Sequence, residues 1–99
     1  MSRLLWSPAA LQDIQRLYRF LADINLDAAK RAIKAIREAV QILSAHPEAG
    51  RPAEEMEAEY RELLISFGSS GYVALYRHDG ETTMMLAIRH QKEAGYGYF

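Results

Sequence analysis

The chain has 99 residues, of which 49% are hydrophobic and 25% are charged. This length excludes two domains with separate cores, because a domain typically needs about 100 residues. The ordinary balance of apolar and charged residues excludes intrinsic disorder. We therefore expect a single domain over residues 1–99, in which residues 95–99 form a flexible tail.

The sequence carries no sign of a membrane or an oxidising compartment. No apolar run approaches the roughly 18 residues of a membrane span, and the N-terminal segment lacks the apolar core of a secretory signal. The chain has no cysteine, which excludes disulfides, thiolate nucleophiles and thiolate metal ligands. We expect a cytoplasmic protein without a membrane partner.

The net charge of −1 conceals a division of charge along the chain. Acidic residues gather at Glu54, Glu55, Glu57, Glu59 and Glu62. Basic residues lie on both sides of this run, at Lys30, Arg31, Lys34 and Arg37 and at Arg61, Arg77, Arg89 and Lys92. Such groups form either a solvated face or a patch that meets an acidic partner. The near-neutral total argues against direct nucleic-acid binding by the chain alone.

The N-terminal half predicts a short strand followed by a helix. Residues 3–7 are mostly aliphatic and aromatic, and Ser7 can cap a helix that begins with Pro8. Apolar residues then recur every three or four positions until Asn25, as on one face of a helix. These residues are Leu11, Ile14, Leu17, Tyr18, Leu21 and Ile24.

A second helix is expected to follow and to form a hairpin with the first. Asn25 or Asp27 can cap its start, and Pro47 ends it near residues 45–46 because a residue before proline avoids the helical conformation. Its apolar residues alternate steps of four and three, a seam typical of helix packing. They are Ala29, Ile33, Ile36, Val40 and Leu43.

The C-terminal half predicts an antiparallel meander. After a loop over residues 49–59, three strands are expected at 60–67, 72–78 and 82–90. Asp79-Gly80 favours a type I′ hairpin turn between the last two. Strict alternation would place Met84, Leu86, Ile88 and His90 on one face of the last strand and Met85, Ala87 and Arg89 on the other.

The predicted elements together define the fold class. An N-terminal strand, a helical hairpin and a three-stranded antiparallel meander make an α+β domain whose helices cover one face of the sheet. The other face is expected to stay partly apolar, with nothing in this chain to cover it.

The residues that could carry chemistry gather after the last strand. Arg89, His90, Lys92 and Tyr96 combine positive charge, an imidazole and a phenol, a mixture that suits a phosphate group. Equally, Arg89 could pair with a loop glutamate while His90 donates to a backbone carbonyl. No glycine-rich phosphate loop or metal-ligand spacing occurs, so we expect no metal and no cofactor.

Six segments follow one another along nearly the whole chain: Trp6–Ala10, Asp27–Ala29, His46–Pro52, Tyr60–Leu63, Gly71–Arg77 and Ala87–Tyr96. In this order they resemble the ParE/RelE superfamily of toxins from bacterial type II toxin-antitoxin modules, and especially its ParE branch. The resemblance implies the ParE/RelE-like toxin fold and a cognate antitoxin as partner.

The superfamily contains two activities, and two residues bear on the choice. RelE-like members are ribosome-dependent endoribonucleases that cut mRNA, and they place basic residues where this chain has Leu63 and Val73. Losing a charge that stabilises the transition state costs about 100-fold or more in rate. ParE-like members resemble this chain in Tyr72-Val73 and act on DNA gyrase. The resemblance therefore implies a toxin that inhibits growth and stabilises plasmids. It also implies that the toxin acts by binding DNA gyrase and not as an enzyme.

Two alternatives stay open beside gyrase inhibition. One is a ribonuclease that uses Arg61, Arg89, His90 and Tyr96, and the other is a degenerate member that binds antitoxin without being toxic. For gyrase binding we assign no catalytic residue, and the aromatic tail is either a frayed end or a docking element. The candidate interface residues are Arg61, Arg77, Arg89, His90, Lys92, Tyr96 and Tyr98.

Overall fold

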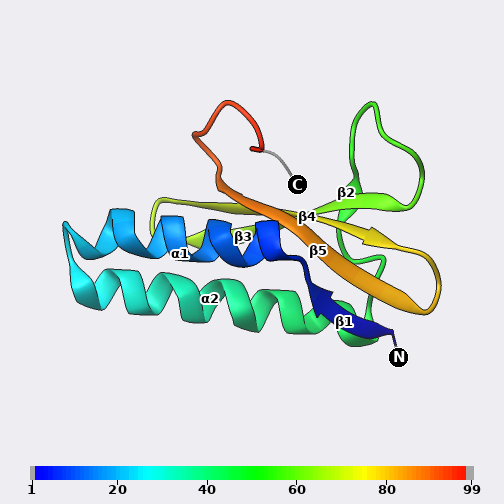
Figure 1. Ribbon diagram of the computed structural model, residues 1–99, viewed down its shortest axis with the longest axis horizontal. Helices are drawn as coiled ribbons and strands as arrows, with labels where there is room; N and C mark the ends of the chain where they lie inside the picture. Colours follow the sequence, from blue (N-terminus) through cyan, green and yellow to red (C-terminus); the bar gives the residue numbers. More distant parts are fainter. Residues whose placement is uncertain (1, 98–99) are drawn as a thin grey trace.

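The computed structural model describes residues 2–97 and contains two helices and five strands (Figure 1). Their order is β1 (Arg3–Trp6), α1 (Pro8–Ala22), α2 (Leu26–Ala45), β2 (Arg51–Pro52), β3 (Tyr60–Phe67), β4 (Ser70–His78) and β5 (Thr82–His90). The predicted α+β class is confirmed, with an N-terminal strand, a helical hairpin and an antiparallel meander. Neither helix in residues 2–97 is long and apolar enough to span a membrane.

The strands form one sheet in the order β1-β5-β4-β3-β2. β1 runs parallel to β5, whereas every other neighbouring pair is antiparallel. The two helices lie side by side on one face of this sheet (Figure 1). The prediction of a loop over residues 49–59 is wrong at Arg51–Pro52, which pair with Glu62 and Arg61 to form β2.

The start and end of α1 follow from local chemistry. The Ser7 hydroxyl accepts a hydrogen bond from the Ala10 amide, and Pro8 occupies the first turn, where its missing N–H costs nothing. The apolar face buries Ile14 and Leu17 against the sheet. The helix ends at Ala22, so Ile24 lies beyond it and is 73% exposed, contrary to the predicted periodicity.

Asn25 caps α2, which decides between the two predicted caps. Its side chain accepts a hydrogen bond from the Ala28 amide at 3.1 Å. The helix runs to Ala45, with His46 as its C-cap, as the position of Pro47 predicts. The residues that α2 buries are Ala29, Ala32, Ile36, Val40 and Leu43.

The main core lies between the helices and the sheet. It combines the buried residues of both helices with Tyr72, Ala74 and Tyr76 from β4 and with Ile65 from β3. These strand residues are two positions apart and therefore share the face that meets the helices.

The chain itself covers the middle of the opposite face of the sheet, so the prediction that nothing in this chain covers that face is wrong there, whereas Leu64 on the same face is 52% exposed. Ala53, Leu75 and Ala87 are buried there, under Met56 and Tyr96. Met56 belongs to the segment between β2 and β3, and Tyr96 follows β5. Both segments lie on the side of the sheet away from the helices (Figure 1). Sequence alternation reported the apolar face correctly but not the two irregular segments that fill it.

A β-bulge breaks the alternation expected for β5. Leu75 pairs with Ala87, but the next residue, Tyr76, pairs with Met85, so Leu86 is an extra residue. Met85 and Ile88 therefore both reach the helix-side core, although strict alternation would separate them. The same offset leaves His90 on the helix side and Arg89 on the opposite face.

The hairpin between β4 and β5 was predicted at the right place but with the wrong turn type. Among residues 2–97 the turn has a positive φ only at Gly80, at 101°, whereas type I′ requires two. The Asp79 carboxylate instead accepts hydrogen bonds from the Glu81 and Thr82 amides. These bonds also lower the pKa of Asp79.

Candidate functional site

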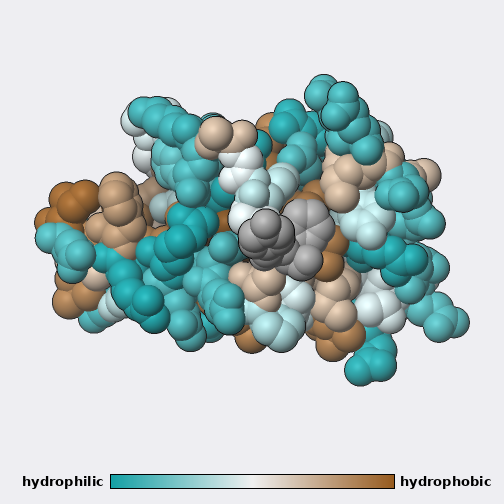
Figure 2. Space-filling model, turned by 45° about the horizontal axis from the view of Figure 1, so that its top comes forward, coloured by the Kyte–Doolittle hydropathy of each residue, from teal (hydrophilic) through white to brown (hydrophobic). Residues whose placement is uncertain are grey.

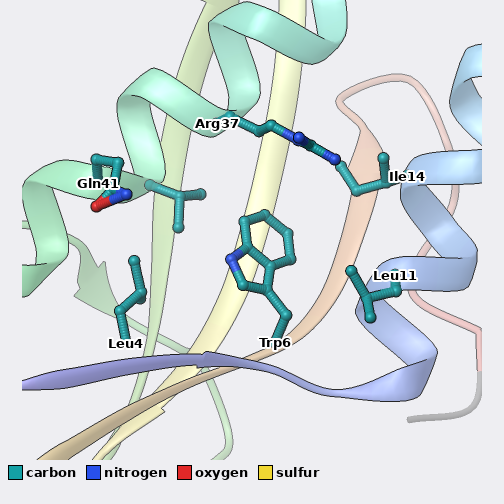
Figure 3. A pocket seen from close by; sticks show the side chains of 7 residues that line it. Leu4, Trp6, Leu11, Ile14, Arg37 and Gln41 are labelled. Atoms are coloured by element: carbon teal, nitrogen blue, oxygen red, sulfur yellow. The ribbon is translucent and has the colours of Figure 1, made fainter.

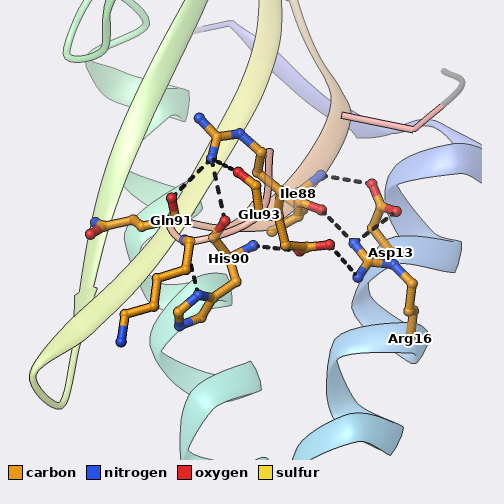
Figure 4. Close-up of polar contacts among 8 residues, drawn as sticks. Asp13, Arg16, Ile88, His90, Gln91 and Glu93 are labelled. Carbon is orange, nitrogen blue, oxygen red and sulfur yellow. Dashed lines mark hydrogen bonds and ion pairs between the residues drawn. The ribbon is translucent and has the colours of Figure 1, made fainter. Parts of the chain in front are cut away.

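A tight turn follows β5 and holds the residues that sequence reasoning selected (Figure 4). The His90 amide donates to the Glu93 carboxylate at 2.8 Å, and the Glu93 amide donates to the His90 carbonyl at 3.0 Å. The Lys92 amide donates to His90 Nδ1 at 3.1 Å. His90 thus accepts a backbone hydrogen bond, in contrast to the predicted donation to a carbonyl, and in the neutral ring Nε2 carries the proton.

Two side chains of α1 fasten this turn to the helix. The Ile88 amide, next to the bulge, donates to the Asp13 carboxylate at 2.9 Å. Arg16 lies between Asp13 and Glu93, with ion-pair distances of 3.5 Å and 3.0 Å. Figure 4 shows the chain of contacts from α1 to the turn. Sequence reasoning missed the roles of Asp13, Arg16 and Glu93. Glu93 lies three positions after His90, which is the only local signal of its capping role.

Arg89 projects to the face away from the helices and holds the turn from that side. One guanidinium nitrogen, Nη1, donates to the carbonyl oxygens of His90, Gln91 and Glu93 at 3.2–3.3 Å. The guanidinium also lies over the Tyr96 ring, 5.1 Å from its centroid. Within residues 2–97 it forms no ion pair, so the alternative in which a loop glutamate neutralises Arg89 is wrong.

Tyr96 is anchored to the same face as Arg89. Its hydroxyl donates to Glu62 Oε2 at 2.5 Å, and Arg51 pairs with Oε1 of the same carboxylate at 3.1 Å. Burial, together with the hydrogen bond and charge of Glu62, raises the pKa of Tyr96 far above its ordinary value. The phenol therefore stays protonated near neutral pH. Tyr98, the other tyrosine predicted to bind a target, lies outside the described residues.

His90 lies on the opposite side of the sheet from Arg89 and faces an apolar cavity. Its ring meets Tyr72 edge-on, with centroids 5.4 Å apart. The cavity has a volume of about 510 Å³ and is lined by α1, the ends of β3 to β5 and the turn. Phe20 lines it and is 69% exposed. Lys92 is exposed at its rim.

The apolar lining of this cavity continues to the end of the helical hairpin. Ile24 and Leu26, which join α1 to α2, are 73% and 50% exposed. Hydrophobic atoms gather at this end of the molecule in Figure 2, where the two helices meet in Figure 1. An apolar surface with a basic rim is a feature typical of protein interaction sites.

The remaining candidates lie elsewhere. Arg61 donates to the carbonyl oxygen of Gly50 at 2.6 Å and shares the helix-side face of β3 with Ile65. Four residues of strand separate Arg61 from the Ile65 level, which is about 13 Å, and His90 lies level with Ile65 across Tyr72. Arg77, at the far end of β4, pairs with Asp79 at 3.5 Å.

The structure thus divides the candidate residues into two pairs and two isolated positions. Arg89 and Tyr96 meet on one face, next to Val73, which pairs across the strands with Leu64 and Arg89. His90 and Lys92 meet on the helix side. Arg61 and Arg77 join neither pair. Among residues 2–97, no group of three or more acidic or histidine side chains is arranged to hold a metal ion.

Comparison with known proteins places this chain among toxins. Residues 4–95 match the family described as the ParE toxin of the type II toxin-antitoxin system, parDE. Toxin RelE3 of Caulobacter vibrioides is 36% identical over 86 residues, which cover 87% of this chain and 90% of that protein. A solved chain of the chromosomal ParDE system from P. aeruginosa superposes with a TM-score of 0.74 at 28% identity and covers 91% of this chain and 96% of its own length. The chain belongs to the ParE toxin family of type II toxin-antitoxin systems.

Proposed function

We propose that this toxin inhibits growth by binding DNA gyrase and that a cognate antitoxin neutralises it. The family match supports the toxin role, and the solved relative belongs to a ParDE system, in which toxin and antitoxin are named together. The choice of gyrase over mRNA cleavage is supported by the way the candidate residues are distributed over the molecule.

The observation that carries the proposal is the separation of the four residues that a ribonuclease would use. Arg89 and Tyr96 lie on the face away from the helices, whereas His90 and Arg61 lie on the helix side. Arg61 is also about four residues of strand, or about 13 Å, from the His90 level. An acid, a base and a phosphate clamp must converge within hydrogen-bond reach of one substrate. This arrangement favours a binding surface.

The chemistry of the Arg89 face supports the same choice. The Tyr96 hydroxyl keeps its proton near neutral pH and donates it in a hydrogen bond to Glu62, so Tyr96 is a poor general base. Glu62 would repel a phosphate. Val73 is 2% exposed and offers no charge beside Arg89. An apolar residue and a carboxylate are unfavourable neighbours for a phosphorane-like transition state.

The target surface that we assign is the turn after β5 with the apolar cavity beside it. Lys92 supplies positive charge at the rim, His90 supplies a polar ring, and Phe20 supplies an exposed aromatic anchor. Aromatic anchors surrounded by polar groups dominate the affinity of protein interfaces. Arg61 and Arg89 instead hold backbone carbonyls, and Arg77 belongs to a separate region of the surface.

One specific contact favours the ribonuclease as a second candidate. Arg89 and Tyr96 stack on each other on an accessible side of the molecule, and the C. vibrioides relative carries a RelE name. If this pair clamps and positions mRNA in the ribosome, loss of either residue would abolish cleavage.

The deciding experiment assays the purified toxin in two reactions. We would measure supercoiling and cleavage-complex formation by gyrase, and cleavage of mRNA on ribosomes, for the wild type, Lys92→Glu, His90→Ala and Arg89→Ala. Lys34→Glu, an exposed charge reversal on α2, is the matched control. We expect gyrase inhibition that Lys92→Glu and His90→Ala weaken several-fold and that Lys34→Glu preserves, because single interface losses are modest.

The other outcomes are equally distinct. Cleavage of mRNA by the wild type that falls by orders of magnitude in Arg89→Ala, with gyrase untouched, would establish the ribonuclease. Neither activity, combined with tight antitoxin binding, would identify a degenerate member of the family.

A further inference from the structure

The turn after β5 is held in shape from the face of the sheet away from the helices. Three carbonyl oxygens of the turn accept hydrogen bonds from Arg89 Nη1 at 3.2–3.3 Å, those of His90, Gln91 and Glu93 (Figure 4). The side chains of His90 and Lys92 instead line the apolar cavity on the helix side. The main-chain conformation that Arg89 holds on one face therefore sets where the target surface presents its side chains on the other.

The orientation of Arg89 is imposed from outside its own strand. Its Nε atom is buried and has no hydrogen-bond partner within residues 2–97. Its cross-strand neighbour Val73 is buried and has no side-chain acceptor. A buried N–H without a partner is unfavourable, so other contacts must hold the guanidinium in this place. The Tyr96 ring, whose centroid is 5.1 Å from the guanidinium carbon, supplies such a contact.

Tyr96 can hold Arg89 because it is itself anchored to β3. Its hydroxyl donates to Glu62 Oε2 at 2.5 Å, and Oε1 of the same carboxylate accepts from Nε and Nη2 of Arg51 at 3.2 Å and 3.1 Å. A Cβ at Gly95 or Gly97 would meet no atom within 4 Å, so the main chain on both sides of Tyr96 lies in open space. The side chain of Tyr96 therefore fastens this part of the chain to the sheet.

We propose that Arg89 and Tyr96 are positioning residues for the target surface. On the face away from the helices they fix the main chain of the turn, and the turn presents His90 and Lys92 on the helix side. The inference rests on the proposed function, because it assigns these roles with respect to the surface that binds gyrase.

The sheet separates the two positioning residues from a partner that binds at the cavity. The described residues that line the cavity include His90 and Lys92 but neither Arg89 nor Tyr96. A protein seated there touches the first pair directly and depends on the second pair only through the shape of the turn. Replacing Arg89 or Tyr96 should therefore change how the turn is ordered before it changes any contact with gyrase.

Amide exchange of the free toxin, followed by NMR, tests the positioning without gyrase. The His90 and Lys92 amides donate within the turn, so in Tyr96→Ala we expect both to exchange about 10-fold or more faster than in the wild type. Tyr60→Ala is the matched control, because Tyr60 packs on the same buried cluster as Tyr96 but pairs with Arg77 at the far end of β4. It should leave the exchange of both amides within about 2-fold of the wild type.

The single tryptophan reports whether each variant keeps its fold. Figure 3 shows Trp6 between β1 and the helices, where it lines a separate cavity of about 320 Å³ together with Leu4, Leu11 and Arg37. The indole N–H resonance should therefore keep its wild-type position. If Tyr96→Ala shifts this resonance, Tyr96→Phe replaces it, since Phe keeps the ring but loses the bond to Glu62. Tyr96→Phe should still speed the exchange of both turn amides about 3-fold or more.

Gyrase inhibition tests whether the positioning matters for the target. Tyr96→Ala and Arg89→Lys should each raise the toxin concentration that halves supercoiling about 10-fold or more, although both variants keep His90 and Lys92. Arg89→Lys also keeps the positive charge but loses the planar guanidinium that spans the turn carbonyls and the Tyr96 ring.

A mutant cycle distinguishes positioning from direct contact. In a toxin that already carries His90→Ala and Lys92→Glu, adding Tyr96→Ala should weaken inhibition by less than about 2-fold, because the side chains that the turn presents are gone. A full additional loss in that background would mean that Tyr96 contacts gyrase itself, and it would overturn the inference.

The outcomes separate this inference from the proposed function. If the wild type inhibits gyrase but Tyr96→Ala changes either the amide exchange or the inhibition without the other, or changes neither, the positioning role is overturned while the proposed function stands. If the wild type does not inhibit gyrase, the proposed function fails, and the role of Arg89 and Tyr96 in presenting a gyrase-binding surface fails with it.

Discussion

The phenol of Tyr76 joins the middle of the sheet to the turn after α2. Its hydroxyl donates to the Pro47 carbonyl at 2.7 Å and accepts from the Gly50 amide at 3.0 Å. A Cβ at Gly50 would lie 2.7 Å from this hydroxyl and from the Glu62 carbonyl, so only glycine fits there. A buried polar atom with two partners fixes the path of the loop that leads to β2.

Tyr76→Phe should lower the free energy of unfolding by about 1–3 kcal/mol, because the Gly50 amide and the Pro47 carbonyl would lose their partner while the packing of the ring is kept. Tyr18→Phe is the matched control, since no hydrogen bond to the Tyr18 hydroxyl is present within residues 2–97. Urea unfolding of both variants measures the difference. A Tyr76→Phe variant as stable as the control would contradict the assigned role.

Tyr96 makes the folding stability of the toxin depend on pH in the alkaline range. The pKa of Tyr96 is raised above its ordinary value of 10.0, so the folded state holds the proton more tightly than the unfolded state. Its stabilising contribution is complete below about pH 10 and is lost as the pH rises toward the folded pKa. Burial raises the pKa of Tyr72 and Tyr76 in the same direction.

The Tyr96 contribution can be isolated by unfolding wild type and Tyr96→Phe between about pH 8 and about pH 11. The wild type should lose stability more steeply above about pH 10 than Tyr96→Phe does. Identical slopes would show that Tyr96 ionises as freely in the folded state as in the unfolded one.

Among the elements, α2 contributes the apolar seam around which the hairpin packs. Ile36 is fully buried between α1 and the sheet, whereas Ile42 on the same helix is 52% exposed. The four-and-three spacing predicted this seam correctly, because helix packing depends on which residues share a face. It failed for Leu11, which shares the apolar face of α1 but is 46% exposed.

Ile36→Ala should cost about 2–5 kcal/mol of folding free energy, because it leaves a cavity in the core. Ile42→Ala should change stability by less than about 0.5 kcal/mol, since its side chain is largely in water. Thermal and urea unfolding of the pair provide the check, and equal losses would contradict the packing of α2.

A carboxylate of α1 binds the main chain of β5. Asp13 accepts the Ile88 amide just after the bulge and is also near Arg16. Asp13→Ala should lower the free energy of unfolding by about 1.5–3 kcal/mol, because a partly buried amide loses a charged acceptor. Asp13→Asn keeps an acceptor oxygen and should retain most of the stability. If Asp13→Asn lowers the free energy of unfolding as much as Asp13→Ala does, the hydrogen bond is not the source of the effect.

At the scale of the whole molecule, sequence patterns predicted the elements well and their exceptions poorly. The bounds of β3 and β5 were predicted to the residue, because clear apolar runs end at strong turn signals. The two-residue β2 has no periodicity of its own and exists through pairing with β3. The bulge in β5 depends on pairing with β4 and is held by Asp13, 75 positions away in the chain. Local pattern cannot report either contact.

In the candidate site, too, local sequence predicted some features and tertiary pairing determined the others. Sequence chemistry selected Arg89, His90 and Tyr96, and alternation separated His90 from Arg89, but only the bulge decides which of these two residues faces the helices. Glu62, the partner of Tyr96, is 34 positions away and was interpreted as part of an acidic run. Residue type therefore selected the candidate side chains, and tertiary pairing determined which of them meet.

Antitoxin binding should stabilise the whole toxin. A partner that binds only the folded state raises the free energy of unfolding by about 2.7 kcal/mol at a free concentration 100 times its Kd. Thermal unfolding with increasing antitoxin should therefore show a steadily rising Tm. A Tm that does not move at saturating antitoxin would mean that the partner does not select the folded toxin.

The pairing of the first strand with the last has a consequence for synthesis on the ribosome. β1 leaves the ribosome before the other described strands. Its neighbour in the sheet is β5, which is made about 80 residues later and in which Thr82 pairs with Arg3. The docking of α1 on the sheet also waits for this strand, because Asp13 accepts the hydrogen bond of the Ile88 amide. Contacts between such distant residues form late. The assigned target surface therefore cannot form before β5 has been made, so a partner that recognises this surface has nothing to bind on a shorter nascent chain.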